Sequence, residues 1–224
     1  MSIQHLDFYF DYISPYAYFA WFNVKALCDR RGLDLYAHPV LFAGLLNHWG
    51  QLGPAEIPPK REFVFKDAAR YAARRGIAFT MPQAHPFNPL LALRLSHVEP
   101  DAAKRRAIID EIWKVGWQEG GDLASPEVLR RALALAGLQA AEWLPRATTP
   151  EMKDQLRHET EAAVARGVFG VPTLIVGDEL FWGNDRFDDV EAYLDGNDPL
   201  DREFIAHMLA RPRGTDRPGK GTKA

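Results

Sequence analysis

The sequence contains a single cysteine, Cys28, among its 224 residues. One cysteine excludes an intrachain disulfide, a CxxC redox pair and a multi-cysteine metal site. Its helical spacing from Val24 and Leu27 indicates a buried structural thiol. Any sulfur chemistry must therefore use a thiol that is supplied from outside the chain.

Long apolar runs and an excess of basic residues are also lacking. No apolar run approaches the roughly 20 residues needed to cross a bilayer, and the N-terminus lacks the pattern of a signal peptide. The formal net charge is -3, a balance that does not suit nucleic acid or an anionic membrane. We expect a cytoplasmic protein whose partner is a small molecule, with no nucleic acid and no membrane as partner.

Motifs of several common site classes are missing as well. The seven histidines form no HExxH motif or other close pair, so we predict no metal site. The sequence also has no GxGxxG, Walker or GxSxG motif. The chemistry must therefore be sought at the ends of the predicted strands and helices.

The beginning of the chain predicts a strand, a helix and a second strand. Apolar residues alternate over residues 5–10, and a helix is predicted from Pro15 to about Arg31 with Ser14 as its N-cap. The second strand is predicted over residues 33–41. A connection of this length predicts that the two strands are parallel.

The middle of the chain is predicted to be almost wholly helical. It follows a segment, residues 42–59, in which glycine and proline interrupt every pattern and predict a loop. Helical spacing with start and stop signals then covers residues 60–76, 101–120, 125–137 and 149–167. We expect these helices to pack together as an insertion.

Strand patterns return only near the C-terminus. Residues 173–176 and 179–182 flank a Gly177-Asp178 turn, which is typical of a hairpin. A short helix is predicted over about residues 186–194, and Asp185 is placed to cap it.

The order of these elements predicts an α/β protein, with a thioredoxin-like domain that carries an inserted all-helical domain. We expect residues 1–44 and 165–198 to form the thioredoxin-like domain and residues 45–164 to form the insertion. The tail, residues 211–224, has no apolar periodicity and is expected to be disordered.

Ser14 stands at the carboxyl end of the first strand and at the start of the first helix. Ser-Pro at a helix start is good capping chemistry, worth about 1 kcal/mol, and the same pair recurs at Ser125-Pro126. However, ligands of open α/β sheets bind at this edge, and a helix N-terminus favours an anion. A hydroxyl there can donate a hydrogen bond to a thiolate and lower its pKa. Both roles remain open for Ser14.

Two later motifs border predicted elements in the same way. In GVFGVPT, Val171-Pro172 directly precedes a strand, and Gly167 and Gly170 permit close approach of a ligand to the Val171 backbone. In FWGNDRFDD, Asp185 either caps the last helix or receives the ammonium group of a ligand. The two roles of Asp185 are compatible.

Four polar residues near prolines are weaker candidates. AHPFNPLLALR contains His85, Asn88 and Arg94, where asparagine before proline is most often turn chemistry. Lys60 follows two prolines, and a lone lysine is usually solvated.

Five motifs of the sequence occur in the same order in a known family. The motifs FYFDYISPYAYFA, KREFVFKDAARYA, HPFNPLLALR, GVFGVPT and FWGNDRFDDVEAYL together resemble those of 2-hydroxychromene-2-carboxylate isomerases. These enzymes are related to kappa-class glutathione transferases in the DsbA-like branch of the thioredoxin superfamily. The resemblance covers about residues 5 to 195. It implies glutathione as cofactor, a homodimer, and a role in aromatic-compound catabolism.

The resemblance also implies roles for single residues. Ser14 matches the serine that stabilises the glutathione thiolate, and Val171 would bond to the glutathione backbone beside a cis Pro172. Lys60 and Asn88 resemble family residues of the ligand cleft, on the glutathione side and the substrate side respectively. The residues that would hold the γ-glutamyl end of glutathione are Asn184, Asp185 and Arg186.

The sequence departs from the family at two positions near the aromatic substrate. The isomerases tend to have a lysine where Asn47 stands and an asparagine where Gln51 stands. The primary expectation is a glutathione-dependent isomerase with a small aromatic substrate. A kappa-type glutathione transferase or peroxidase, and a glutathione-binding module without catalysis, remain as alternatives. A thiol-disulfide oxidoreductase is excluded, because Ser14 and Ala17 occupy the positions of the redox cysteines and Cys28 lies about four helical turns away.

Overall fold

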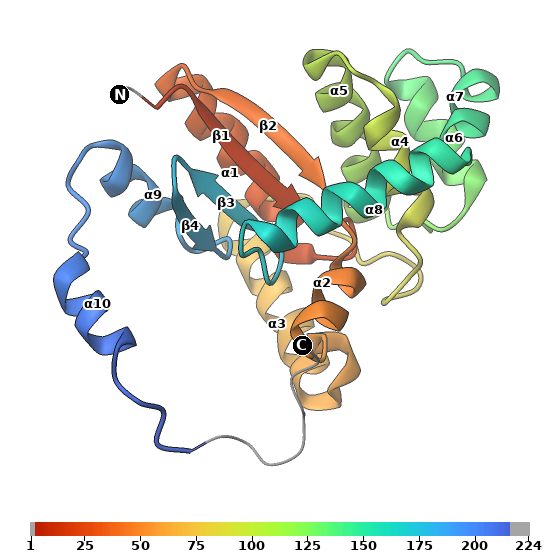
Figure 1. The fold of residues 1–224 in the computed structure, drawn as a ribbon. Helices are drawn as coiled ribbons and strands as arrows, with labels where there is room; N and C mark the ends of the chain where they lie inside the picture. The colour runs from red at the N-terminus through yellow and green to blue at the C-terminus, as the bar shows by residue number, and fades with distance from the viewer. Residues whose placement is uncertain (1–2, 216–224) are drawn as a thin grey trace.

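The computed structural model describes residues 3–215, which contain one four-stranded sheet and a series of helices (Figure 1). The strand order is β2-β1-β3-β4. β1 pairs with β2 in parallel and with β3 antiparallel, and β3 and β4 form an antiparallel hairpin. The parallel first pair and the hairpin are confirmed. The strands are β1 (His5–Phe10), β2 (Asp34–Pro39), β3 (Thr173–Val176) and β4 (Glu179–Trp182).

The helices account for most of the remaining chain. A 3-10 turn (Pro54–Glu56) precedes α3, and α5 continues into a π-helical turn (Lys114–Gln118). The helices are α1 (Pro15–Arg31), α2 (Phe42–Trp49), α3 (Pro58–Arg75), α4 (Leu90–Val98), α5 (Ala102–Trp113), α6 (Pro126–Leu135), α7 (Ala140–Arg146), α8 (Pro150–Ala165), α9 (Phe187–Leu194) and α10 (Arg202–Leu209).

The sheet lies between two layers of helices because β1 is buried on both faces. Phe8 belongs to the same buried cluster as Trp21 of α1 and Val190 of α9. Tyr9 points to the opposite face and packs with Leu45 of α2 and Ala163 of α8. Figure 1 shows α8 running across this second face. Helices α4 to α7 gather beyond one end of the sheet (Figure 1).

The first helix begins and ends where the sequence signals predict. Ser14 has extended backbone, and its Oγ accepts a hydrogen bond from the Ala17 N–H at 3.2 Å. At the other end, Gly32 has a φ of 65°, and its N–H donates to the Cys28 carbonyl. A left-handed residue at this position is most easily glycine.

The prediction of a loop over residues 42–59 is wrong, because α2 lies within this segment. The first turn of α2 is held by residues that are far away in the sequence. The Phe42 N–H donates to Oδ2 of Asp11 at 2.9 Å, and the Leu41 N–H donates to Oγ1 of Thr160 at 3.0 Å. These tertiary partners outweigh a weak local helix signal.

The predicted capping of α9 by Asp185 is also wrong. The N-cap residue of α9 is Arg186, and no side chain accepts a hydrogen bond there. The Asp185 carboxylate instead forms an ion pair with the Arg186 guanidinium. Asp188 and Asp189 supply the negative charge that favours a helix start.

Two expectations remain outside what the structure tests. The predicted domain boundaries, at residues 44, 164 and 198, stay a prediction. Residues 211–215 of the expected disordered tail form neither helix nor strand, and residues 216–224 lie outside the described residues.

Candidate functional site

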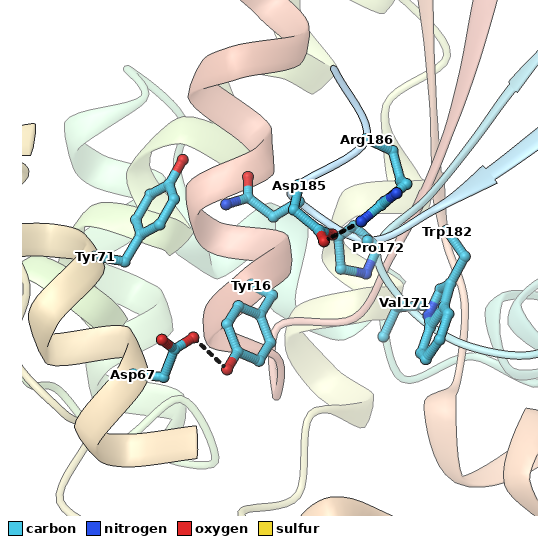
Figure 2. Close-up of a pocket in the computed structure, with 10 residues that line it drawn as sticks. Tyr16, Asp67, Tyr71, Val171, Pro172, Trp182, Asp185 and Arg186 are labelled. Atoms are coloured by element: carbon cyan, nitrogen blue, oxygen red, sulfur yellow. Dashed lines mark hydrogen bonds and ion pairs between the residues drawn. The ribbon is translucent and has the colours of Figure 1, made fainter. Parts of the chain in front are cut away.

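A cleft of about 650 Å³ opens between the first turn of α1, helix α3 and the loops that flank the β3–β4 hairpin. Figure 2 shows Tyr16, Asp67 and Tyr71 on one side of it, opposite Pro172 and Trp182. The lining residues are Tyr16, Asp67, Tyr71, Val171, Pro172, Trp182, Gly183, Asn184, Asp185 and Arg186.

The segment before β3 brings open backbone groups to this cleft. The Val171–Pro172 peptide bond is cis, as the resemblance implied, and the Pro172 carbonyl accepts from the Gly183 N–H at 3.0 Å. Within residues 3–215, the N–H and carbonyl of Val171 have no hydrogen-bond partner. Because Tyr9 pairs with Thr173, this segment continues along the end of β1 that leads to Ser14. A peptide-like ligand can therefore pair with Val171 beside that end of the sheet.

Asn184 is held in the cleft by a helix residue that the sequence analysis did not single out. The side-chain amide of Asn23, on α1, donates to Oδ1 of Asn184 at 3.0 Å and to the hydroxyl of Tyr71 at 3.1 Å. Because Oδ1 of Asn184 is engaged in this way, its own amide group keeps its two donors for a ligand.

Asp185 and Arg186 place one negative and one positive group at the rim of the cleft. The hydrogen bond from Arg186 lowers the pKa of the Asp185 carboxyl below its usual range. Arg186 also contacts Asp189, with 3.2 Å between the guanidinium and Oδ2. Asp185 is therefore ionised at neutral pH and suited to a ligand ammonium, whereas Arg186 is suited to a carboxylate.

Opposite these residues, Tyr16 donates a hydrogen bond to Oδ2 of Asp67 at 2.9 Å. Burial, together with Asp67 as acceptor, raises the pKa of the Tyr16 phenol. The phenol is therefore neutral at physiological pH. This bond joins the first turn of α1 to α3 and fixes the width of the cleft at that point.

Trp182 forms an aromatic wall of the cleft. Its side chain is 53% exposed, and its ring packs edge-on against Phe169 at a centroid distance of 5.1 Å. Gly170 permits this arrangement, since a Cβ there would lie 2.6 Å from Nε1 of Trp182. An exposed aromatic face held in this way can pack against a flat or apolar ligand group.

Ser14 itself does not line the cleft, but Tyr16, two residues later, does. Ser14 is 8% exposed, and its Oγ accepts the single hydrogen bond from Ala17. The hydroxyl proton is therefore still able to donate. Both expectations for Ser14, the helix cap and a hydrogen-bond donor to a ligand, are compatible with this geometry.

The remaining predicted site residues also lie outside the cleft lining. Lys60 is exposed in the first turn of α3, and its spacing from Asp67 puts both on one face of that helix. Oδ1 of Asn88 accepts from the Leu90 N–H at 3.0 Å, which is the turn chemistry of an asparagine before proline. Asn47 and Gln51 are exposed at the end of α2.

Several cleft residues were missed by sequence reasoning. Asp67 and Tyr71 carry one signal that points to a shared helix face, their spacing of four residues in α3. Tyr16 follows directly after the Ser-Pro pair. Asn23 and Trp182 carry no local signal, because their roles depend on partners that only the fold brings near.

Residues 3–215 offer little support for a metal site, a membrane-spanning helix or a reactive cysteine. That part of the chain holds no group of three or more histidine, cysteine or acidic side chains that could bind a metal ion. It also holds no helix that is long and apolar enough to cross a membrane. Cys28 is buried, and burial raises the pKa of its thiol to about 11. Its thiol is therefore a poor nucleophile at neutral pH.

Comparison with known proteins identifies a matching domain family and several similar enzymes. The family model described as a DSBA-like thioredoxin domain matches residues 5–195. A 2-hydroxychromene-2-carboxylate isomerase of Sphingobium xenophagum is 31% identical over 84% of this chain and 97% of its own length. Human glutathione S-transferase kappa 1 is 25% identical over 91% of this chain and 90% of its own.

A solved structure confirms the predicted fold class. The structure of a 2-hydroxychromene-2-carboxylate isomerase superposes with a TM-score of 0.78 at 24% identity, covering 91% of this chain and 99% of that one. The thioredoxin-like fold with inserted helices is therefore shared. The chain belongs to the 2-hydroxychromene-2-carboxylate isomerase family, within the proteins that carry the DsbA-like thioredoxin domain.

Proposed function

We propose that the protein is a glutathione-dependent isomerase that acts on a small aromatic substrate of the 2-hydroxychromene-2-carboxylate type, in aromatic-compound catabolism. The printed names of its relatives, isomerases and glutathione transferases, support this class of activity. The observation that carries the proposal concerns Val171, which lines the cleft and whose backbone N–H and carbonyl groups have no hydrogen-bond partner within residues 3–215. A tripeptide cofactor needs such groups, whereas most small aromatic ligands do not.

The residues of the cleft fit glutathione, which carries one ammonium group, two carboxylates and two peptide bonds. Asp185 would bind the ammonium group, while Arg186 and the Asn184 amide would bind the neighbouring carboxylate. Val171 would pair with the cysteine residue of glutathione beside Pro172. Lys60, on the cleft-facing side of α3, would bind the second carboxylate.

Ser14 would provide the catalytic hydrogen bond. When bound, glutathione would supply a thiolate as a reversible nucleophile toward a conjugated substrate, chemistry that needs no oxidant or reductant. The Ser14 hydroxyl would donate to this sulfur while its oxygen accepts from Ala17. The N-terminus of α1 adds partial positive charge at the same place. Both effects favour the thiolate over the thiol.

The aromatic substrate would bind next to Asn47, Gln51 and Asn88. Asn47 and Gln51 carry no charge, so any carboxylate of the substrate would receive hydrogen bonds there and no ion pair. The substrate can therefore differ from that of isomerases with a lysine at the first of these positions.

The test combines calorimetry with turnover of the chromene substrate. Wild type is expected to bind glutathione, and Ser14→Ala is expected to bind it within a few-fold while turnover falls by about two orders of magnitude or more. Ser125→Ala is the matched control, because Ser125 is also a serine before a helix-starting proline, and its side chain makes no capping bond. Absence of glutathione binding, or full turnover by Ser14→Ala, would refute the proposal.

A kappa-type glutathione transferase or peroxidase is the second candidate, favoured by the kappa relative and by the uncharged pair Asn47 and Gln51. It would use the same glutathione contacts but accumulate a conjugate or oxidised glutathione. A mass spectrum of the products distinguishes the two. Binding without turnover of any electrophile would instead indicate a non-catalytic glutathione-binding module. The cytoplasmic location and the homodimer remain predictions within this proposal.

A further inference from the structure

A second cleft, of about 620 Å³, lies between α2, α4 and α8. Figure 1 shows α8 running beside both other helices, and none of the residues proposed to bind glutathione lines this cleft. Arg94, which the sequence analysis noted and the proposed function does not use, projects from α4 into its lining.

Arg94 is a cation without a counter-ion. Its Nε is buried and has no hydrogen-bond partner, and no carboxylate within residues 3–215 forms an ion pair with it. Burial lowers the pKa of Arg94, but a guanidinium stays charged at neutral pH. Arg94 as a whole is half-buried, so water reaches only part of its guanidinium, and an anionic ligand would supply the missing partner.

Among the residues that line the cleft, arginine and lysine outnumber acidic residues. Lys153, on α8, also has no carboxylate partner in the described part of the chain. Glu161 lines the cleft too, but it pairs with Arg157 at 3.6 Å, and Arg157 also pairs with Asp154 at 3.0 Å. Arg94 and Lys153 are therefore the two cations available to a ligand.

The rest of the lining is apolar and held in place. Leucines 41, 90 and 156 and Val164 form this wall. Thr160 fastens α2 to α8, because its Oγ1 accepts from the Leu41 N–H and donates to the Leu156 carbonyl. A Cβ at Gly44 would lie 3.0 Å from Cγ2 of Thr160, so glycine permits this close approach. The cleft is therefore preformed, as ligand sites usually are.

We propose that this cleft binds an organic carboxylate with an aromatic or other apolar body. Arg94 would receive the carboxylate through paired N–H groups, Lys153 would add a second positive charge, and the leucine-rich wall would cover the apolar body. A compact inorganic anion would leave this wall unused. The proposal does not depend on glutathione binding, because the two clefts share no lining residue.

The test uses naphthoate as probe and its uncharged analogue naphthamide as control, titrated by calorimetry into full-length protein saturated with glutathione. We expect naphthoate to bind at least about tenfold more tightly than naphthamide, with an affinity that falls as salt increases. Arg94→Gln is expected to weaken naphthoate binding by about tenfold and Lys153→Gln by about two- to fivefold. Arg130→Gln, which changes an exposed arginine of α6, is expected to leave it unchanged.

Further variants separate the two clefts. Trp182→Ala changes the glutathione cleft and should not alter naphthoate affinity, whereas a loss of affinity would place the probe there and overturn the proposal. Equal binding of naphthamide, or an unchanged affinity in Arg94→Gln, would also overturn it. If Arg94→Gln does not fold, the naphthoate affinities of Lys153→Gln and of its charge-conserving control Lys153→Arg test the proposal. Only Lys153→Gln should bind naphthoate more weakly than wild type, and equal affinity of the two variants would overturn the proposal. Glutathione affinity of the Lys153 variants, measured separately, should equal that of wild type whether or not naphthoate binds.

Discussion

The amide nitrogen of Asn23 lies 3.0 Å from Oδ1 of Asn184, although 161 positions separate the two residues in the sequence. Asn23 does not line the cleft, and its amide group donates to Asn184 and Tyr71, so we infer that it orients these two residues. We predict that Asn23→Ala weakens glutathione binding by about tenfold, because Asn184 then loses its fixed orientation.

A structural effect alone would not produce this result. The melting temperature of Asn23→Ala reports general destabilisation, and Asn23→Asp, which lacks the amide donor, should weaken glutathione binding in a similar way. Equal glutathione affinity for wild type and both variants would show that Asn184 needs no support from α1.

The buried carboxyl of Asp11 predicts an unusual dependence of stability on pH. Burial raises its pKa to about 7 against the effect of backbone hydrogen bonds from Phe42 and Ile13, compared with 3.8 for an ordinary aspartate. The folded protein therefore binds more protons than the unfolded chain between these values. The contribution of Asp11 to stability is fully present below pH 3.8 and is lost as pH rises through about 7, at up to about 1.4 kcal/mol per pH unit.

Asp11→Asn removes this titration. The free energy of unfolding of the variant, measured in urea and compared with wild type, should rise relative to wild type between about pH 4 and pH 7 and then level off. The absolute stability of Asp11→Asn is expected to be lower at acidic pH, because an amide can accept only one of the two backbone hydrogen bonds. A carboxyl titration midpoint near 3.8 in the folded protein, by carbon NMR, would contradict the prediction.

The hydrogen bond from the Phe42 N–H to Asp11 explains why one helix could not be predicted from the sequence. The sequence predicts Ser14 as a helix cap and the β3–β4 hairpin correctly, because their signals lie within a few neighbouring residues. Helix α2 was missed because its first N–H groups bond to Asp11 and Thr160. No window around Phe42 contains either partner.

The candidate site likewise contains residues that local sequence motifs predict and residues that they do not. Val171 and Asp185 lie in short motifs with a strand or helix beside them, so their approach to one cleft follows from the fold class. Asn23 and Asp67 stand in the middle of ordinary helical patterns. Their positions in the site depend on how α1 and α3 pack, which helical periodicity alone does not determine.

A polar cluster on the sheet face covered by α8 predicts a second loss of stability as pH rises, in the same direction as that of Asp11. His38 lies 2.9 Å from Oδ1 of Asp7 and 2.5 Å from Oε1 of Glu159. Burial alone would lower the pKa of His38, but hydrogen bonds to the two carboxylates outweigh it and raise the pKa. The contribution of charged His38 is therefore fully present below pH 6.5 and is lost as pH rises through its raised pKa.

We predict that His38→Gln lowers the free energy of unfolding by about 1–3 kcal/mol below neutral pH, and by less in alkaline solution. Urea unfolding over a range of pH measures this difference. His158→Gln, on the exposed face of α8, is the matched control and should change stability by less than about 0.5 kcal/mol at every pH. A cost of His38→Gln that does not vary with pH would contradict the prediction.

The environment of Ser14 can be tested without glutathione. In Ser14→Cys, the new sulfur would lie at the N-terminus of α1, where the Ala17 N–H now donates to Oγ. Exposed N–H groups and the helix dipole stabilise a thiolate, so we predict a thiol pKa below the usual value of about 8.5. The pH dependence of alkylation by iodoacetamide measures it. Cys28, whose pKa is about 11, provides the internal control and should stay unreactive over the same range.

The burial of Ser14 and a charged Asp11 both oppose the thiolate, so a pKa of 8.5 or above in Ser14→Cys would show that these two effects outweigh the helix N-terminus. Ser14 would then serve only as the cap of α1, and thiolate stabilisation would have to come from another residue.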